Sequence, residues 1–99
     1  MIKYYLTNKA VQDLEDIWDY TVDEWSEQQA ERYYKMLIDT FHEITQNPEI
    51  GKKYTEISLN LFGLRTGKHI IFYRRINSDT IEITRILHEM MDLKRRIKE

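Results

Sequence analysis

The stretch 63–92, GLRTGKHIIFYRRINSDTIEITRILHEMMD, decides the fold, because it contains short runs of strand-forming residues separated by turn residues. Runs of this length, bounded by glycine, asparagine, serine and aspartate, are typical of β-strands joined by tight turns. We predict strands at 61–66, 69–76 and 80–88, with turns at 67–68 and 77–79. Three strands that follow one another in this way form an antiparallel meander.

These predicted strands carry more positive charge than a sheet needs. Arg65, Arg74 and Arg85 interrupt apolar runs such as Ile70-Ile71-Phe72-Tyr73. A strand with one face on a core alternates apolar and polar residues, and a buried cation costs free energy unless it is paired. The pattern therefore indicates a cationic face that awaits an anionic partner.

The position of Arg85 is ambiguous. Ile81 and Ile83 share one face of the last strand, and strict alternation places Arg85 and Leu87 on that face as well. Either Arg85 is buried with a partner, or a β-bulge turns the end of the strand, as often happens beside functional sites. The sequence leaves both alternatives open, so Arg85 is either a structural ion-pair partner or part of a site.

The residues before the meander predict a strand and a first helix. In residues 2–6, Ile2, Tyr4 and Leu6 alternate with Lys3 and Tyr5, which suits a short strand with one buried face. Thr7 or Asn8 can then cap a helix whose apolar residues recur at steps of three and four. Trp18 and Trp25 fall on its apolar side, which favours a core position for both.

A second helix follows after a short turn. Ser26 and Gln29 match a capping box, and Pro48 requires the helix to end just before it. Two helices joined so closely form an αα-hairpin, and the sheet is the natural cover for its apolar stripe. Residues 51–60 are predicted to be a loop, and residues 93–98 a final helical turn. The predicted class is α+β, with residues 1–99 forming one domain.

The charge is divided unevenly between the two halves of the chain. Residues 1–50 sum to −7 and residues 51–99 to +5, within a formal net charge of −2. Such asymmetry indicates an acidic protein segment or another polyanion as the partner of the basic half. Solvated charge on both halves is the alternative.

Composition argues against several other classes. There is no cysteine, which excludes disulfides and cysteine-based zinc sites. His42, His69 and His88 lack a close ligand spacing, so neither a metal site nor a cofactor is expected. No basic region followed by an apolar run opens the sequence, and no segment approaches a membrane span, so we expect a cytoplasmic protein without a membrane partner.

The chain also carries a series of short motifs over nearly its full length, none of them diagnostic alone. In order they are Leu6-Thr7-Asn8-Lys9-Ala10, Asp13-Leu14, Ile17, Tyr20, Trp25, Gln29-Ala30, Tyr33, Asn47-Pro48, Gly51, Gly63-Leu64-Arg65, His69, Ile71-Phe72-Tyr73-Arg74, Arg85-Ile86-Leu87-His88 and Met91-Asp92. In this order and spacing the chain resembles the ParE branch of the RelE/ParE toxins of bacterial type II toxin–antitoxin systems.

The resemblance implies a RelE/ParE-like fold, with a helical hairpin on a small antiparallel sheet. It also implies a cognate antitoxin, ParD-like or other, whose C-terminal segment wraps and neutralises the toxin. Toxins of the ParE branch typically act on DNA gyrase, stabilise its cleaved DNA complex and block replication. Fold alone does not decide the activity, because related toxins are ribosome-dependent mRNA nucleases.

RNA cleavage would require a base, an acid and cations around the phosphate. His88 could exchange protons near neutral pH, but Glu89-Met90-Met91-Asp92 follows it and places negative charge where a phosphate would bind. We therefore interpret His88 as a structural residue, hydrogen-bonded near Asp92 or the preceding strand, and expect no catalytic residue. An mRNA endonuclease and a non-toxic, decayed binding module remain the alternatives.

The candidate contacts to antitoxin or target fall into three groups. Arginines of the sheet can pair bidentately with carboxylates, aromatic residues of the hairpin can anchor a partner, and the basic tail can attract the gyrase–DNA complex. No direct sequence-specific contact with nucleic acid is expected. The candidates are Arg65, Arg74, Arg85 and His88 in the sheet, Trp18 and Tyr34 in the hairpin, and Lys94, Arg95 and Arg96 in the tail.

Overall fold

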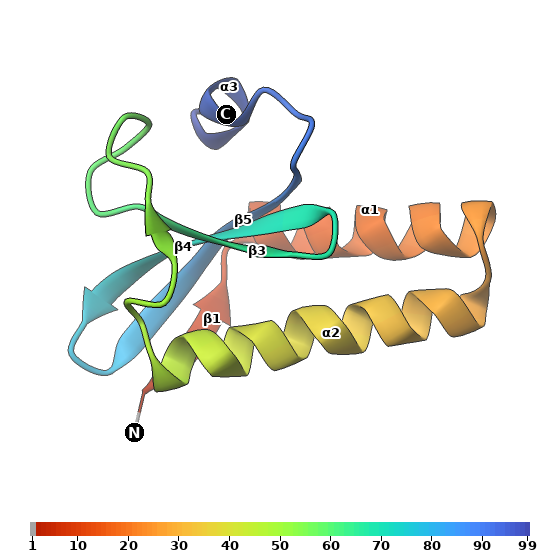
Figure 1. The fold of residues 1–99 in the computed structure, drawn as a ribbon, viewed down its shortest axis with the longest axis horizontal. Coiled ribbons are helices and arrows are strands. Elements are labelled where there is room, and N and C mark those ends of the chain that lie inside the picture. Colours follow the sequence, from red (N-terminus) through yellow and green to blue (C-terminus); the bar gives the residue numbers. More distant parts are fainter. Residues whose placement is uncertain (1) are drawn as a thin grey trace.

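A helical hairpin covers one face of a five-stranded sheet in the computed structural model, which describes residues 2–99 (Figure 1). The elements follow one another as β1 (Lys3–Leu6), α1 (Asn8–Glu24), α2 (Glu27–Gln46), β2 (Lys52–Lys53), β3 (Phe62–Thr66), β4 (His69–Asn77), β5 (Thr80–His88) and α3 (Leu93–Ile97). The predicted α+β class and the order of strand, hairpin, meander and terminal helix are confirmed. None of the helices in this part of the chain has the length and apolar character needed to cross a bilayer.

The sheet has the order β1-β5-β4-β3-β2. Strands β3, β4 and β5 form the predicted antiparallel meander, and β1 pairs in parallel with β5 because the hairpin carries the chain back across the sheet. Strand β2 lies within 51–60, where a loop was predicted, so that prediction was wrong for two residues. Lys52 and Lys53 have no strand signal of their own and pair only because Gly63 and Phe62 lie beside them.

The N-terminus of each helix of the hairpin is capped as the sequence predicts. The Thr7 side chain accepts from the amide of Ala10, which decides between Thr7 and Asn8 as the cap of α1. The Ser26 hydroxyl accepts from the amide of Gln29 at the start of α2. These caps satisfy amides that have no partner within the helix.

The apolar residues form two clusters, one on each face of the sheet. The first cluster joins the hairpin to the sheet and includes Leu37, Phe41, Ile71, Tyr73, Ile81, Ile83 and Ile86. The second consists of Leu61, Ile70, Phe72 and Leu87, and Tyr54, Ile57, Leu93 and Ile97 cover it. Helix α3 therefore packs on the sheet through Leu93 and Ile97.

A β-bulge in β5 resolves the question of Arg85. Phe72 pairs with Arg85 and Tyr73 with Ile83, so Thr84 has no opposite residue on β4. Strict alternation is therefore wrong beyond Thr84. Arg85 is also buried and paired, so both alternatives that the sequence left open are true at once.

Candidate functional site

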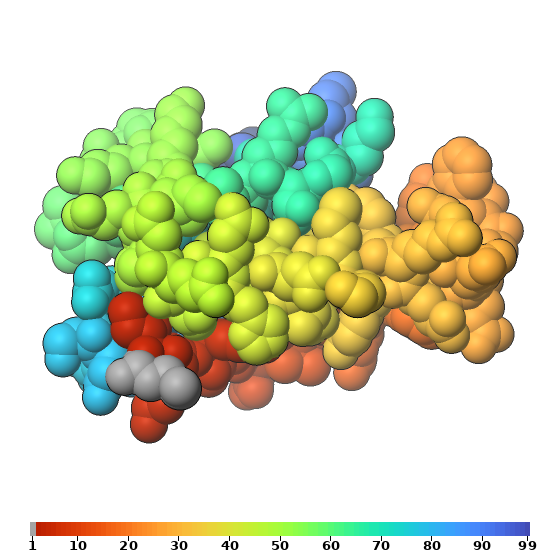
Figure 2. Space-filling view, turned by 60° about the horizontal axis from the view of Figure 1, so that its bottom comes forward, coloured from red at the N-terminus to blue at the C-terminus, as the bar shows by residue number. Residues whose placement is uncertain are grey.

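A cleft of about 830 Å³ lies where the helical hairpin extends beyond the end of the sheet. One wall is formed by α1 residues between Asp13 and Trp25, and the other by the β3–β4 turn, the end of β5 and the segment 89–91. Gln29 and Tyr33 of α2 and Arg96 of α3 complete the lining. Figure 2 shows the end of the hairpin, in orange, projecting past the blue-green turn between β3 and β4. The concavity exists because the helices are longer than the strands that they cover.

The floor of the cleft contains a hydrogen-bonded group of aromatic residues. The Tyr33 hydroxyl accepts from the amide of Lys68 at 3.0 Å and lies 2.6 Å from Nδ1 of His69. The rings of His69 and His88 meet edge to face, with 5.3 Å between their centroids. Nδ1 of His88 accepts from the amide of Met90, so the neutral ring carries its proton on Nε2.

Burial, followed by the neighbouring His88, lowers the pKa of His69 to about 4. An imidazole with this pKa is neutral at pH 7 and does not serve as a proton donor there. The floor therefore supplies a neutral hydrogen-bonding surface. Within residues 2–99, no group of three or more histidine or carboxylate side chains is arranged to hold a metal ion.

Large apolar side chains stand exposed around the cleft. The exposed fractions are 63% for Tyr20, 74% for Trp25, 82% for Met90 and 40% for Met91. Aromatic residues and methionine are enriched at protein–protein interfaces, and so much exposed apolar surface around one concavity indicates a binding site.

The prediction that Trp25 is a core residue was wrong. Trp25 is the C-cap of α1, with φ −126° and ψ −84°, so the chain leaves helical geometry there and the side chain departs from the apolar stripe. Trp18 remains half-buried and packs edge to face against Tyr34, with 6.0 Å between ring centroids. Neither Trp18 nor Tyr34 is part of the cleft lining.

Arg85 holds three elements together. Its Nε and Nη2 donate to the two carboxylate oxygens of Asp13, at 2.8 and 2.9 Å, and its Nη1 donates to the carbonyl of Arg96 at 2.7 Å. Glu99 lies 3.5 Å from the same Nη1. This arrangement links α1, β5 and α3, which gives Arg85 a structural role.

Asp13 has a second function at this point of the sheet. Strand β1 pairs with β5 only as far as Ile83, so residues 84–88 form an open edge. One carboxylate oxygen of Asp13 accepts from the amide of Ile86 at 3.0 Å. Asp13 therefore occupies the edge position that an added strand would need.

The other two predicted arginines share the sheet face of the second apolar cluster, but each has an acidic neighbour within the chain. Arg65 pairs with Glu89 at 2.5 Å. Arg74 donates to the hydroxyl of Ser58 at 2.7 Å and lies 3.8 Å from Glu82. The sheet thus places the three arginines on one face, and each of them has a carboxylate of the same chain as its neighbour.

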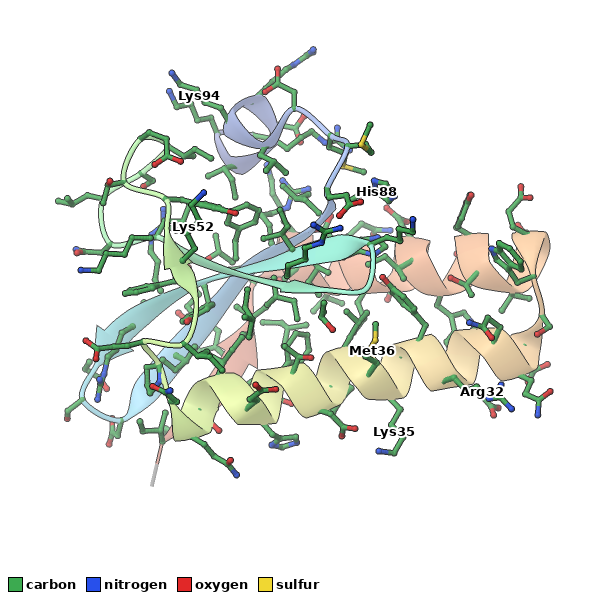
Figure 3. The ribbon with its side chains drawn as sticks, viewed as in Figure 1. Arg32, Lys35, Met36, Lys52, His88 and Lys94 are labelled. Carbon is green, nitrogen blue, oxygen red and sulfur yellow. The ribbon has the colours of Figure 1, made fainter. Side chains whose placement is uncertain are left out.

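The remaining predicted residues lie at the cleft or on α3. His88 lines the cleft and bonds to the backbone of Met90, whereas Asp92 caps α3. Arg96 also lines the cleft and lies 3.4 Å from Glu99. Lys94 and Arg95 are exposed, and Figure 3 shows Lys94 pointing away from the sheet.

Sequence reasoning missed Tyr20, Tyr33, Met90 and the cleft itself. Met90 lies in a segment with no unusual local signal, and the exposure of both Tyr20 and Met90 depends on where the sheet ends. The interruption of the apolar pattern by Tyr20 between Ile17 and Thr21 is the one feature that points to an exposed aromatic residue.

Comparison with solved structures places this architecture among known toxins. The toxin–antitoxin system described as "Chromosomal ParDE TA system from P. aeruginosa" superposes with a TM-score of 0.74 at 20% identity, covering 89% of this chain and 96% of the other. The RelBE2 toxin–antitoxin complex of Mycobacterium tuberculosis superposes with a TM-score of 0.67 at 20% identity, covering 89% and 98%. The fold is that of the RelE/ParE toxins.

Comparison of the sequence identifies the family, whereas the solved structures identify only the fold. Residues 4–93 match the family described as the ParE toxin of the type II toxin–antitoxin system parDE. Toxin ParE1 of M. tuberculosis is 38% identical over 95 residues, with 96% of this chain and 97% of the relative covered. Toxin ParE1 of Caulobacter vibrioides is 32% identical over 94 residues, with 95% and 96% covered. The chain belongs to the ParE family of type II toxins.

Proposed function

We propose that this toxin inhibits DNA gyrase by binding, without catalysing a reaction itself, and that a cognate antitoxin neutralises it. Family membership supports a growth-inhibiting toxin, and gyrase is the usual target of this family. The observation that carries the binding mechanism is the cleft, which combines an exposed aromatic and methionine rim with a neutral floor. Such a site suits recognition of a protein segment.

The same residues offer little support for RNA cleavage. The pKa of His69 leaves it neutral at pH 7, and Arg65, Arg74 and Arg85 already have carboxylate neighbours. Asp16 and Glu89 add carboxylates to the cleft lining beside Lys68 and Arg96, and their negative charge opposes the binding of a phosphate group. A ribonuclease would need an available general acid at this place, and His69 does not supply one at pH 7.

Purified toxin added to gyrase and relaxed plasmid tests the target. We expect weaker supercoiling and an accumulation of cleaved DNA. Relaxation of the supercoiled form of the plasmid by a type I topoisomerase is the control, which the toxin should leave unaffected. Normal gyrase activity together with codon-linked mRNA cuts in a translation extract would replace the proposal with the nuclease. Growth without arrest, and no effect in either assay, would identify a non-toxic module.

The antitoxin is expected to dock in the cleft, and co-expression in growing cells tests this. Tyr20→Ala and Met90→Ala should weaken protection by the antitoxin while the free toxin stays folded. Leu59→Ala is the matched control, because Leu59 is 76% exposed and lies outside the cleft. Equal protection for all three variants would remove the cleft from antitoxin binding.

A further inference from the structure

The face of the sheet opposite the helical hairpin receives positive charge from two segments that are distant in the chain. Lys52 of β2 pairs with Gly63 of β3, where an added Cβ would lie 3.2 Å from Phe72 of the second apolar cluster. Directly opposed residues of neighbouring strands point to the same side of a sheet, so Lys52 extends over this face. Its Nζ lies 5.2 Å from the centre of the Tyr54 ring, which covers the same cluster. Lys52 therefore holds its charge above the second apolar cluster.

Helix α3 supplies the other cations of this face. Leu93 and Ile97, which are one helical turn apart, pack on the second apolar cluster. Lys94, Arg95 and Lys98 therefore lie on the outward side of this segment, and all three are exposed. Figure 1 shows α3 and the loop after β2 on the side of the sheet away from the hairpin, and Figure 3 shows Lys52 and Lys94 on that side. We call Lys52, Lys94, Arg95 and Lys98 the basic face.

The positive charge of the basic face is not compensated within the described part of the chain. Segments 52–60 and 92–99 contain six lysine or arginine residues and three carboxylates. Two of these carboxylates are already engaged, because Asp92 caps α3 and Glu99 lies 3.5 Å from Arg85. None of the four cations of the basic face forms an ion pair among the residues that the structure describes. An anionic partner can therefore use this excess of positive charge.

The composition of the basic face favours phosphate over a protein segment as its partner. Three of the four cations are lysines, which are depleted at protein–protein interfaces and are common ligands of phosphate. In segments 52–60 and 92–99, which the structure describes completely, Leu59 is the one large apolar side chain that is exposed. A protein interface needs a cluster of apolar anchors, whereas phosphate contacts need only exposed cations. The rim of the cleft has such a cluster and the basic face does not.

We propose that the basic face contacts the phosphate backbone of the DNA that gyrase holds, without reading its sequence. This inference rests on gyrase as the proposed target and assigns one face of the toxin to the DNA of that complex. Residues 10–31 of the hairpin, on the other side of the sheet, contain eight carboxylates and no lysine or arginine (Figure 1). DNA repels this side, so its phosphates orient the toxin with the hairpin turned away. Because the net charge of the chain is −2, the toxin alone binds DNA weakly, and contacts to gyrase supply the remaining affinity.

Fluorescence anisotropy of a short labelled DNA duplex, titrated with the full-length toxin in the absence of gyrase, tests this contact. We expect binding at low salt that weakens with a slope of about −3 to −4 in log K against log salt, because four phosphate contacts each contribute about 0.9. Duplexes of different sequence should bind equally well. No binding at low salt, or an affinity that does not change with salt, would overturn the proposal.

Polyglutamate is titrated in parallel as the probe for an acidic protein partner. Phosphate recognition predicts that the duplex binds more tightly than polyglutamate at equal charge concentration. Tighter binding of polyglutamate would show that the basic face recognises an acidic protein segment, and it would overturn the assignment to DNA.

Lys52 and Lys53 give a matched pair of variants. Lys53 is also exposed, but it pairs with Phe62, whose ring stacks on Tyr73 in the first apolar cluster, so it points to the other side of the sheet. Lys52→Gln should reduce the salt slope by about 1 and weaken DNA binding roughly three- to tenfold at low salt, and Lys94→Gln should act in the same way. Lys53→Gln should leave both quantities unchanged. Equal effects of the Lys52 and Lys53 variants would show a general effect of charge and would overturn the assigned face.

The gyrase assay separates this inference from the proposed function. The double variant Lys52→Gln with Lys94→Gln should need roughly tenfold more toxin than the unaltered chain for the same amount of cleaved DNA, and added salt should narrow the difference. A double variant as potent as the unaltered toxin would overturn the inference and leave gyrase as the target. If the unaltered toxin has no effect on gyrase, the proposed function fails, whereas the anisotropy experiment, which contains no gyrase, still shows whether the basic face binds DNA.

Discussion

Removal of the Asp13 carboxylate should be among the most destabilising single changes outside the apolar core. The side chains of Arg85 and Asp13 are only 8% and 12% exposed, and Asp13 accepts three hydrogen bonds, two from Arg85 and one from Ile86. In Asp13→Ala the guanidinium loses its nearest counter-charge and the amide of Ile86 loses its acceptor. Breaking a buried pair in this way costs about 3–5 kcal/mol of unfolding free energy.

In Asp13→Ala, the contacts that Arg85 retains place the expected loss of unfolding free energy at the lower end of this range. The carbonyl of Arg96 still accepts from Arg85, and Glu99 remains 3.5 Å away. We therefore expect a loss of about 3 kcal/mol, a large part of the ~5–15 kcal/mol typical of a domain. For a chain of this size the melting temperature should fall by roughly 12–24 °C.

A double-mutant cycle separates the ion pair from the packing around it. Asp13→Leu combined with Arg85→Met replaces both charges by apolar side chains, which is often close to neutral when such a pair is buried. Urea unfolding followed by circular dichroism gives the unfolding free energy of each variant, and an unchanged m-value shows that the comparison is valid. A cost below about 1 kcal/mol for Asp13→Ala would refute the buried pair as the source of stability, as would a cost of the double mutant equal to the sum of the costs of Asp13→Leu and Arg85→Met alone.

Three further predictions concern the floor of the cleft, the β3–β4 turn and the tail. The lowered pKa of His69 means that the folded state favours its neutral form, so its contribution to stability is present above pH 6.5 and lost towards pH 4. Urea unfolding of His69→Gln at several pH values should therefore show a weaker dependence of unfolding free energy on pH in this range. Gly67 has φ +58°, and an added Cβ would lie 2.7 Å from the Tyr33 hydroxyl, so Gly67→Ala should cost roughly 1–3 kcal/mol in the same assay. Replacing Lys94 and Arg95 by glutamine should change stability by less than about 0.5 kcal/mol and weaken growth arrest, while unchanged toxicity would exclude both charges from target binding.

The basic tail illustrates why substitution is a better test than deletion. From sequence, 93–98 is a final helical turn with a few apolar residues, and a frayed terminus is its simplest alternative. In the structure, Leu93 and Ile97 cover the second apolar cluster, and Arg85 donates to the backbone of Arg96. Deleting this segment would expose core residues, so loss of toxicity in a truncated protein would not report on its charge.

Signals between residues close in the sequence were sufficient to predict most of the helices and strands. The caps at Thr7 and Ser26, the break before Pro48 and the turn residues of the meander act within a few residues of one another, so the sequence alone predicts helices and strands there. Strand β2 was missed because the pairing of Lys52 depends on Gly63, which is eleven residues away in the chain and contributes nothing to the local pattern.

The functional surface depended on contacts between distant residues. The sequence by itself determined the α+β order, the hairpin, the meander and the uneven distribution of charge, because propensity, capping and periodicity are short-range effects. The tertiary structure decided that Arg85 meets Asp13, 72 residues away, and that Trp25 is exposed. It also formed the cleft, because only the packed lengths of the helices and strands determine where the hairpin extends past the sheet.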